Sequence, residues 1–267
     1  MLRGILAALI ALPCAGALAA DLSSATLVEK GALTYGVAAS FAPFEFMKDG
    51  KPLGFDIDLI DALSKKLSVE AKAMNMDFKG LIPALQGGRI DIINSAMYIN
   101  PKRAEQVDFV PYLKIGNQVL VQASNPGKIT GRDASLCGKT IAVTLGAIEE
   151  TYAREDDKRC KDAGAAAVTV LTLPTAQDSY LTLRQGRADA AFDSTPGAVE
   201  LIENSPGVYA VAGAEFESNT QIGMATRKGD KAVADALQAA LKELVADGSY
   251  KALIAKWKLP ATVALFD

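Results

Sequence analysis

Short apolar runs alternate with segments of helical periodicity along most of this chain. Five runs have the length and composition of buried strands: 34–38, 90–94, 119–121, 140–143 and 168–173. Apolar residues recur at helical spacing over 58–67, 81–85, 232–245 and 249–257, and after Glu149. Short strands that alternate with helices are typical of α/β proteins with largely parallel sheets. The pattern therefore predicts an α/β fold.

One sequence pattern occurs twice, and the two copies are 98 residues apart. Residues 85–93 are LQGGRIDII, and residues 183–191 are LRQGRADAA. In each copy a glycine suits the left-handed turn that ends a helix, and Arg-x-Asp leads into a strand. We expect the Arg and Asp side chains to lie on the turn, facing water or each other. Chance similarity is the alternative, but strands and helices alternate around both copies, which favours two related lobes.

Each copy of the repeat leads into a short segment with polar residues. Asn94 to Tyr98 follow the first copy, and Phe192 to Pro196 follow the second. Ligands of open α/β sheets bind beyond the carboxyl ends of the strands. We therefore expect both segments to face a shared ligand cleft.

The composition is that of a globular protein. The chain has 267 residues, of which 50% are apolar and 22% are charged. This length suits two lobes of roughly 100–150 residues each. The formal net charge is −3, and no long run of Lys and Arg is present. A surface for phosphate groups is therefore not expected, and we predict no nucleic-acid partner.

The first twenty residues have the features of a signal peptide. Arg3 gives a positive start, and the apolar stretch 5–12 is too short to span a bilayer. Residues 17–19 are Ala-Leu-Ala, the small-x-small pattern of a signal-peptidase site. Cys14 does not fit a lipid-attachment site, because Pro13 stands where a small residue is needed. We predict a signal peptide over 1–20 and export to the periplasm.

Two cysteines remain after this segment, Cys137 and Cys160. An exported chain lies in an oxidising compartment, where the two thiols can pair. A bridge would close a loop of about 23 residues and stabilise the fold by roughly 3 kcal/mol. We predict this disulfide as a structural bridge; the alternative is two buried free thiols.

Several kinds of catalytic chemistry are missing from the sequence. The chain contains no histidine, which excludes a Ser-His-Asp triad and removes the commonest metal ligand. It has neither a phosphate-binding P-loop nor a glycine-rich dinucleotide motif after a strand. Glu45, Glu149 and Asp193 could meet in a cleft as catalytic acids, or could be solvated or capping carboxylates. We expect a binding protein rather than an enzyme, without cofactor or metal.

A set of motifs resembles the periplasmic polar-amino-acid-binding proteins of ABC importers, solute-binding protein family 3. The motifs are APFEF at 42–46, GFDIDL at 54–59, LIPAL at 81–85, SAMYINPKRA at 95–104, VDF at 107–109, GKTIAV at 138–143, GRADA at 186–190 and RKGD at 227–230. They cover nearly the whole chain after the signal segment, in register. The resemblance implies a two-lobed type II periplasmic-binding fold that closes around its ligand. The implied lobes are 21–116 with 218–267, and 117–217, with crossings near 115–118 and 217–221.

The resemblance also implies the residues of a ligand site. Arg103 stands where the family places the arginine that binds the ligand carboxylate, a role that suits a guanidinium because it donates two parallel hydrogen bonds. Ala96 and Tyr98 stand where backbone groups hold the ligand. Ile148 stands where a backbone N–H meets the carboxylate, at the start of a predicted helix.

The resemblance also implies two aromatic residues in the wall of this ligand site. Phe41 matches an aromatic residue that stacks on the ligand, and Phe78 matches an apolar wall residue on the other side. Read without the motif, an arginine is more often a surface ion-pair partner, and a phenylalanine is as often part of the core.

Some positions depart from the family pattern. Ser194 stands where the family carries the aspartate that neutralises the ligand ammonium, and Asp193 lies one residue earlier, where alternation of side chains can turn it away. Tyr98 replaces a Ser or Thr, 147–148 replace a Thr pair, and 38–39 offer no acid for a cationic side chain. We therefore expect a ligand with a carboxylate but not lysine or arginine, and leave an α-ammonium open.

The function implied is that of a solute-binding component of an ABC importer. It would bind a small carboxylate-bearing molecule, an amino acid or a derivative, as a monomer, and dock to the permease subunits. One alternative is a cyclohexadienyl dehydratase-like enzyme with Glu149 or Asp193 as proton donor. Another is a sensor that delivers its ligand to a receptor.

Overall fold

The computed structural model describes residues 22–266. The signal peptide predicted over 1–20, with Cys14, lies outside the described residues. Within 22–266, no helix is both long enough and apolar enough to cross a membrane.

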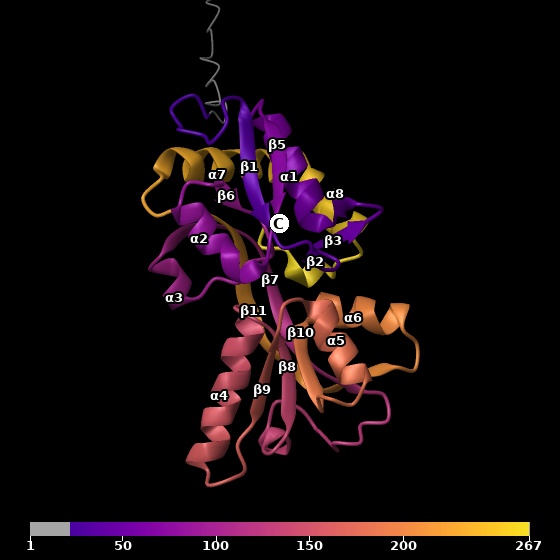
Figure 1. Cartoon of the computed structure of the whole chain (residues 1–267). Helices are drawn as coiled ribbons and strands as arrows, with labels where there is room; N and C mark the ends of the chain where they lie inside the picture. Colours follow the sequence, from indigo (N-terminus) through magenta and orange to yellow (C-terminus); the bar gives the residue numbers. More distant parts are fainter. Residues whose placement is uncertain (1–21, 267) are drawn as a thin grey trace, which may run out of the picture.

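A long mixed sheet runs through the molecule in the strand order β5-β1-β6-β11-β7-β10-β8-β9 (Figure 1). Its strands are β1 (Ala32–Val37), β5 (Glu70–Asn75), β6 (Ile92–Ile93), β7 (Val107–Gln122), β8 (Thr140–Thr144), β9 (Thr169–Leu173), β10 (Ala190–Ser194) and β11 (Tyr209–Arg227). Pairs in the outer parts are parallel, whereas β7 and β11 run antiparallel to each other and to their neighbours β10 and β6. A second, antiparallel sheet contains β2 (Ser40–Phe41), β3 (Glu45–Lys48) and β4 (Lys51–Leu53).

The helices form two groups, one around each end of the long sheet (Figure 1). Around β1, β5 and β6 lie α1 (Phe55–Lys66), α2 (Leu81–Gln86), α3 (Pro101–Ala104), α7 (Lys231–Ala246) and α8 (Ser249–Lys256), with the 3₁₀ turns η1 (Phe78–Gly80) and η3 (Ala261–Val263). Around β8, β9 and β10 lie α4 (Ile148–Asp162), α5 (Ala176–Arg184) and α6 (Thr195–Asn204), with η2 (Ala134–Leu136). The predicted two-lobed α/β fold is confirmed.

Strands β7 and β11 connect the two groups (Figure 1). Their pairing shifts register between Ala212 and Phe216, and again between Phe216 and Thr220. Glu217, inside this stretch, has a φ of 52°, in the left-handed region. We propose this irregular stretch as the crossing between lobe 1, residues 21–116 and 218–267, and lobe 2, residues 117–217.

The two copies of the repeat have the same local structure. Gly88 and Gly186 have φ values of 68° and 69° and end their helices as predicted. Asp91 accepts a hydrogen bond from the Thr34 N–H of β1 at 2.8 Å, and Asp189 accepts one from the Thr140 N–H of β8 at 2.8 Å. The expectation that these side chains face water or each other was wrong for Asp91, which is buried, whereas Asp189 is half-buried and Arg89 and Arg187 are exposed. Each carboxylate accepts a hydrogen bond from a backbone N–H of the neighbouring strand and so links its turn to that strand. Such N–H groups need acceptors when they are buried.

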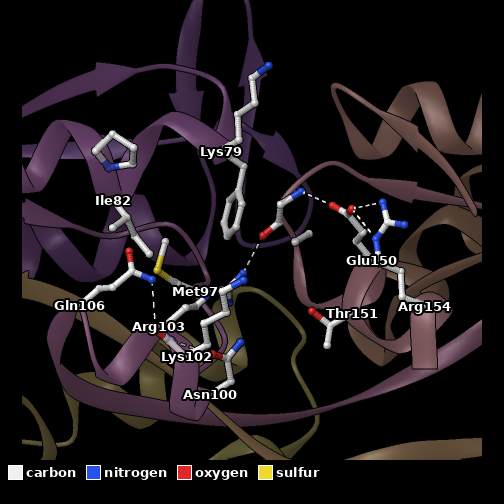
Figure 2. A pocket seen from close by; sticks show the side chains of 14 residues that line it. Lys79, Ile82, Met97, Asn100, Lys102, Arg103, Gln106, Glu150, Thr151 and Arg154 are labelled. Atoms are coloured by element: carbon white, nitrogen blue, oxygen red, sulfur yellow. Dashed lines mark hydrogen bonds and ion pairs between the residues drawn. The ribbon is translucent and has the colours of Figure 1, made fainter. Parts of the chain in front are cut away.

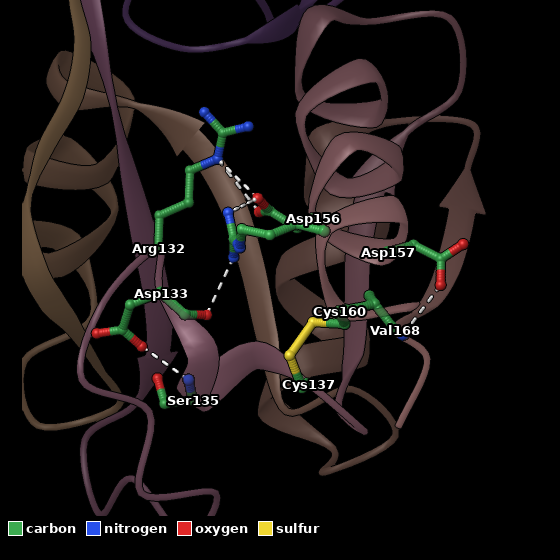
Figure 3. Close-up of a disulfide and its surroundings, with 9 residues drawn as sticks. Arg132, Asp133, Ser135, Cys137, Asp156, Asp157, Cys160 and Val168 are labelled. Carbon is green, nitrogen blue, oxygen red and sulfur yellow. Dashed lines mark hydrogen bonds and ion pairs between the residues drawn. A yellow bond between two sulfur atoms is a disulfide. The ribbon is translucent and has the colours of Figure 1, made fainter. Parts of the chain in front are cut away.

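The predicted disulfide is confirmed. Cys137, after η2, and Cys160, in α4, are joined with a Cα–Cα distance of 5.5 Å (Figure 3). One turn earlier in α4, the buried Asp156 accepts hydrogen bonds from Arg132 and Arg159 (Figure 3). These contacts fix the far end of α4, whose first turn reaches the site described below.

Candidate functional site

Two neighbouring cavities lie where the two halves of the molecule meet, and both are lined by Phe78 and Ala147. The smaller has a volume of about 40 Å³. Its lining consists of Ala38, Ser40, Phe41, Glu45, Phe78, Ala96 and Tyr98 from one half, and Thr144, Ala147, Ile148, Glu149 and Ala176 from the other. The larger, of about 460 Å³, is open to solvent and contains Arg103. Figure 2 shows Arg103 and Lys102 on one side of it and Glu150 and Arg154 on the other.

Helix α3 and its cap position Arg103. The Asn100 side chain accepts a hydrogen bond from the Arg103 N–H at 2.8 Å, and Pro101 begins the helix, where its missing N–H costs nothing. The guanidinium then reaches into the space between the halves. Its Nη1 donates to the Tyr98 carbonyl at 2.6 Å. Its Nη2 donates to the Gly146 carbonyl of the opposite half at 2.9 Å (Figure 2).

The Arg103 side chain is buried and charged. The residue is 7% exposed, and its guanidinium carbon lies 5.3 Å from the centre of the Phe78 ring. Burial lowers the pKa of Arg103 to about 10, so it keeps its charge at neutral pH. In the described part of the chain Arg103 forms no ion pair. The two carbonyl contacts use two of its five N–H groups.

The segment after β6 is held by buried carboxyl groups. Ala96, with a φ of 36°, donates its N–H to Asp56 at 2.6 Å. Ser95 donates to Glu45 at 2.8 Å, and the buried Glu45 and Asp56 carboxyls lie close enough to affect each other's pKa. Burial raises the pKa of Asp56 to about 6 and that of Glu45 well above its usual range. The pair therefore keeps a proton and holds 95–96 in place.

Tyr98 closes part of the small cavity. Its side chain is 3% exposed, and its hydroxyl has no hydrogen-bond partner within residues 22–266. Burial, with the nearby Glu149 and Asp193, raises the pKa of Tyr98 well above its usual range. A tyrosine fills more space than the Ser or Thr expected from the resemblance, which fits the small volume of the cavity.

The opposite half contributes the start of α4. Ile148 is the first residue of the helix, and Glu149 follows it; both are buried and line the small cavity. The Glu149 Oε1 atom has no hydrogen-bond partner among the described residues. Burial raises the pKa of Glu149 to about 7, although Arg103 opposes the shift. From the sequence, Glu149 was considered as an enzymatic acid or as a solvated or capping carboxylate, and not as a ligand-binding group; its place directly after Ile148 was the available signal.

Asp193 and Ser194 lie beside the cavities and line neither of them. Asp193 accepts a hydrogen bond from the Ser194 N–H at 2.7 Å and another from the Tyr180 hydroxyl. Burial, with the nearby Glu149 as a smaller cause, raises the pKa of Asp193 to about 8. The Ser194 hydroxyl accepts from the Gly197 N–H at 3.0 Å and caps α6. The Asp193 carboxylate and the Ser194 hydroxyl are thus both hydrogen-bonded within the fold.

Two α/β halves, a cavity between them and a buried guanidinium inside it define a solute-binding protein. The chain belongs to the bacterial extracellular solute-binding proteins, family 3, whose model matches residues 33–260. The predicted family is therefore confirmed, and with it a binding protein rather than an enzyme.

Individual relatives show how far this likeness extends. The L-cystine-binding protein TcyJ of Escherichia coli K12 is 33% identical over 86% of this chain and 83% of its own length. The histidine-binding periplasmic protein of Salmonella typhimurium is 31% identical over 83% and 85%. The solved structure of an ancestral arginine-binding protein bound to arginine is 36% identical, covers 85% of this chain and 98% of its own, and has a TM-score of 0.78. An ancestral amino-acid-binding protein described as a precursor of cyclohexadienyl dehydratase is 33% identical over 85% and 95%, with a TM-score of 0.76.

Proposed function

We propose that this protein is the periplasmic solute-binding component of an ABC importer and that it binds an amino acid between its lobes. The names of its relatives, which include a cystine-binding protein and an ABC transporter arginine-binding protein, support this class of ligand and partner. The name of the Salmonella relative and the predicted signal peptide support the periplasm. The permease subunits would be the partner of the closed form.

One observation carries the proposal: Arg103 is buried, charged and without an ion pair among the described residues. A buried cation is unfavourable unless it is paired, because it has lost its hydration. A ligand carboxylate would supply the missing negative charge. It would also accept hydrogen bonds from the guanidinium N–H groups that do not donate to the two carbonyls. Phe41, Phe78 and the Ile148 N–H would then surround the ligand, as the sequence predicts, while Asp193 and Ser194 would support that wall from behind.

The small cavity, which adjoins the larger one that contains Arg103, sets limits on a ligand that extends into it. Its 40 Å³ correspond to about three water molecules at roughly 10–15 Å³ each, so the lobes or Tyr98 must move to admit an amino acid. Ala38 lines the cavity, and Glu45, the acid on the same side, already accepts from Ser95 and lies close to the Asp56 carboxyl. We therefore propose an amino acid with an uncharged side chain.

A thermal-shift panel of the twenty L-amino acids and L-cystine tests the function. A ligand at about 100 times its Kd should stabilise the protein by about 2.7 kcal/mol. Arg103→Ala should weaken binding by at least about 100-fold, because it removes one partner of a buried charge pair. The exposed Arg89→Ala variant is the control and should bind like the wild type. The proposal fails if no amino acid stabilises the protein.

A further inference from the structure

Two buried acids line the small cavity, and they differ in their surroundings. Glu45 accepts from Ser95 with Oε1, and its Oε2, which has no partner among the described residues, belongs to a carboxyl that lies close to the buried Asp56 carboxyl. Glu149 is 5% exposed, and its Oε1 atom has no hydrogen-bond partner within the described chain. A buried carboxyl oxygen without a partner is unfavourable in the folded protein. Glu149 is thus an acid in this wall with a free acceptor for a ligand and, unlike Glu45, with no side-chain hydrogen bond from another described residue.

The groups around Glu149 come from several elements. Arg103 of α3 is the cation that lowers its pKa. Tyr98 follows β6, Tyr152 lies on α4 itself, Tyr180 lies on α5 and Asp193 lies in β10; the pKa of each is raised in part by Glu149. Glu45 of β3 lines the same cavity. Apart from Arg103, these groups are neutral or acidic, so they favour a cation beside Glu149.

The positions of Arg103 and Glu149 suit the two ends of a zwitterion. The two residues come from opposite halves, and each shifts the pKa of the other. Arg103 would bind a carboxylate, whereas Glu149 offers an acceptor oxygen for an N–H donor that carries positive charge. Asp193 is not available in the same way, because its two oxygens already accept from Ser194 and Tyr180.

We propose that Glu149 binds the α-ammonium group of the ligand and that it releases a proton to solvent when the ligand binds. The inference deepens the proposed function and rests on it. In the free protein the Glu149 carboxyl carries its proton below about pH 7. On binding, its O–H bond breaks, the proton passes to the buffer, and the carboxylate pairs with the ammonium group.

Isothermal titration calorimetry at pH 6 in phosphate and in imidazole tests the proton release, because the two buffers differ in ionisation enthalpy. The probes are the amino acid of the panel with the largest thermal shift and the carboxylic acid that lacks its amino group. We expect about one proton released per amino acid bound, and none for the deamino acid. The amino-acid affinity should fall about fivefold from pH 7 to pH 6, because the ionised fraction of Glu149 falls from about one half to about one tenth.

Two substitutions on α4 separate this role from a structural one. Glu149→Gln should abolish the proton release and weaken the amino acid at least about tenfold at pH 7, yet leave the deamino acid unchanged. Glu155→Gln is the control and should change neither, because Glu155 is an exposed residue of the same helix that pairs with Arg132.

Wild-type binding without proton release, or unchanged binding by Glu149→Gln, overturns this inference but not the proposed function. If no amino acid binds, this inference and the proposed function both fail, whether or not a deamino acid binds. If Glu149→Gln does not fold, the wild-type titrations decide.

Discussion

Gly146 lies where the two halves touch beside Arg103. Its carbonyl accepts from Arg103, and a Cβ added to it would lie 3.2 Å from the Lys79 Cβ of the opposite half. Its φ of 82° is in the left-handed region, which glycine adopts without strain. A side chain at this position would therefore strain the loop and also push the two halves apart.

Gly146→Ala should lower the amino-acid affinity by about tenfold, because about 1.4 kcal/mol of contact between the halves would be lost. Gly164→Ala is the matched control: its φ is 69°, and nothing lies within 4 Å of an added Cβ. Both variants should lose roughly 1 kcal/mol of unfolding free energy from the backbone strain. Calorimetry on the two proteins separates the effects, and equal affinities would contradict a role for Gly146 in closure.

At the residue scale, the sequence identified five of the twelve residues that line the small cavity. Phe41, Phe78, Ala96, Tyr98 and Ile148 all line the small cavity, because motif positions carry over with the chain path. The part played by Glu149 could not be predicted in the same way. Its free oxygen follows from which acceptors other residues occupy, such as the Glu45 contact with Ser95, and only the folded structure reveals these pairings.

At the element scale, α4 links the site to the disulfide. Its first turn carries Glu149, and Cys160 near its other end is bonded to Cys137. The helix has 15 residues and is therefore about 22 Å long. The bridge is thus far from the cavity, and its effect should be on stability rather than on binding.

The variant with both Cys137→Ser and Cys160→Ser should lose about 3 kcal/mol of unfolding free energy, because the bridge restricts the unfolded chain. Urea unfolding followed by circular dichroism measures this loss. The amino-acid affinity should stay within about twofold of the wild type, since the first turn of α4 keeps its contacts. An unchanged urea midpoint would show that the bridge contributes little.

Elements with strong periodicity were predicted closely, and irregular or half-exposed ones were not. The strand expected at 140–143 is Thr140–Thr144, and the helix expected at 232–245 is Lys231–Ala246. Strand β5, Glu70–Asn75, lies at the sheet edge with no buried residue, so its sequence lacks an apolar run. The central part of β11 is likewise exposed, because it crosses between the halves.

At the scale of the whole molecule, four buried acids dominate the pH dependence between pH 5 and pH 8. Burial raises the pKa of Asp56 to about 6, of Glu149 to about 7 and of Asp193 to about 8, and that of Glu45 well above its usual range. In the unfolded chain these groups titrate near roughly 4. The chain has no histidine, and the described cysteines are bridged, so few other groups titrate in this range.

The unfolding free energy should therefore fall as the pH rises from about 5 to about 8. Over this range the native state holds more protons than the unfolded state, and stability decreases with pH wherever that is so. Hydrogen bonds from Lys228 and within 133–135 lower the pKa values of Asp108 and Asp133, but those contributions are lost only below about pH 4. Urea unfolding at pH 5, 6, 7 and 8 measures the slope, and Glu149→Gln should make it shallower. Greater stability at pH 8 than at pH 5 would show that these acids are ionised in the native protein.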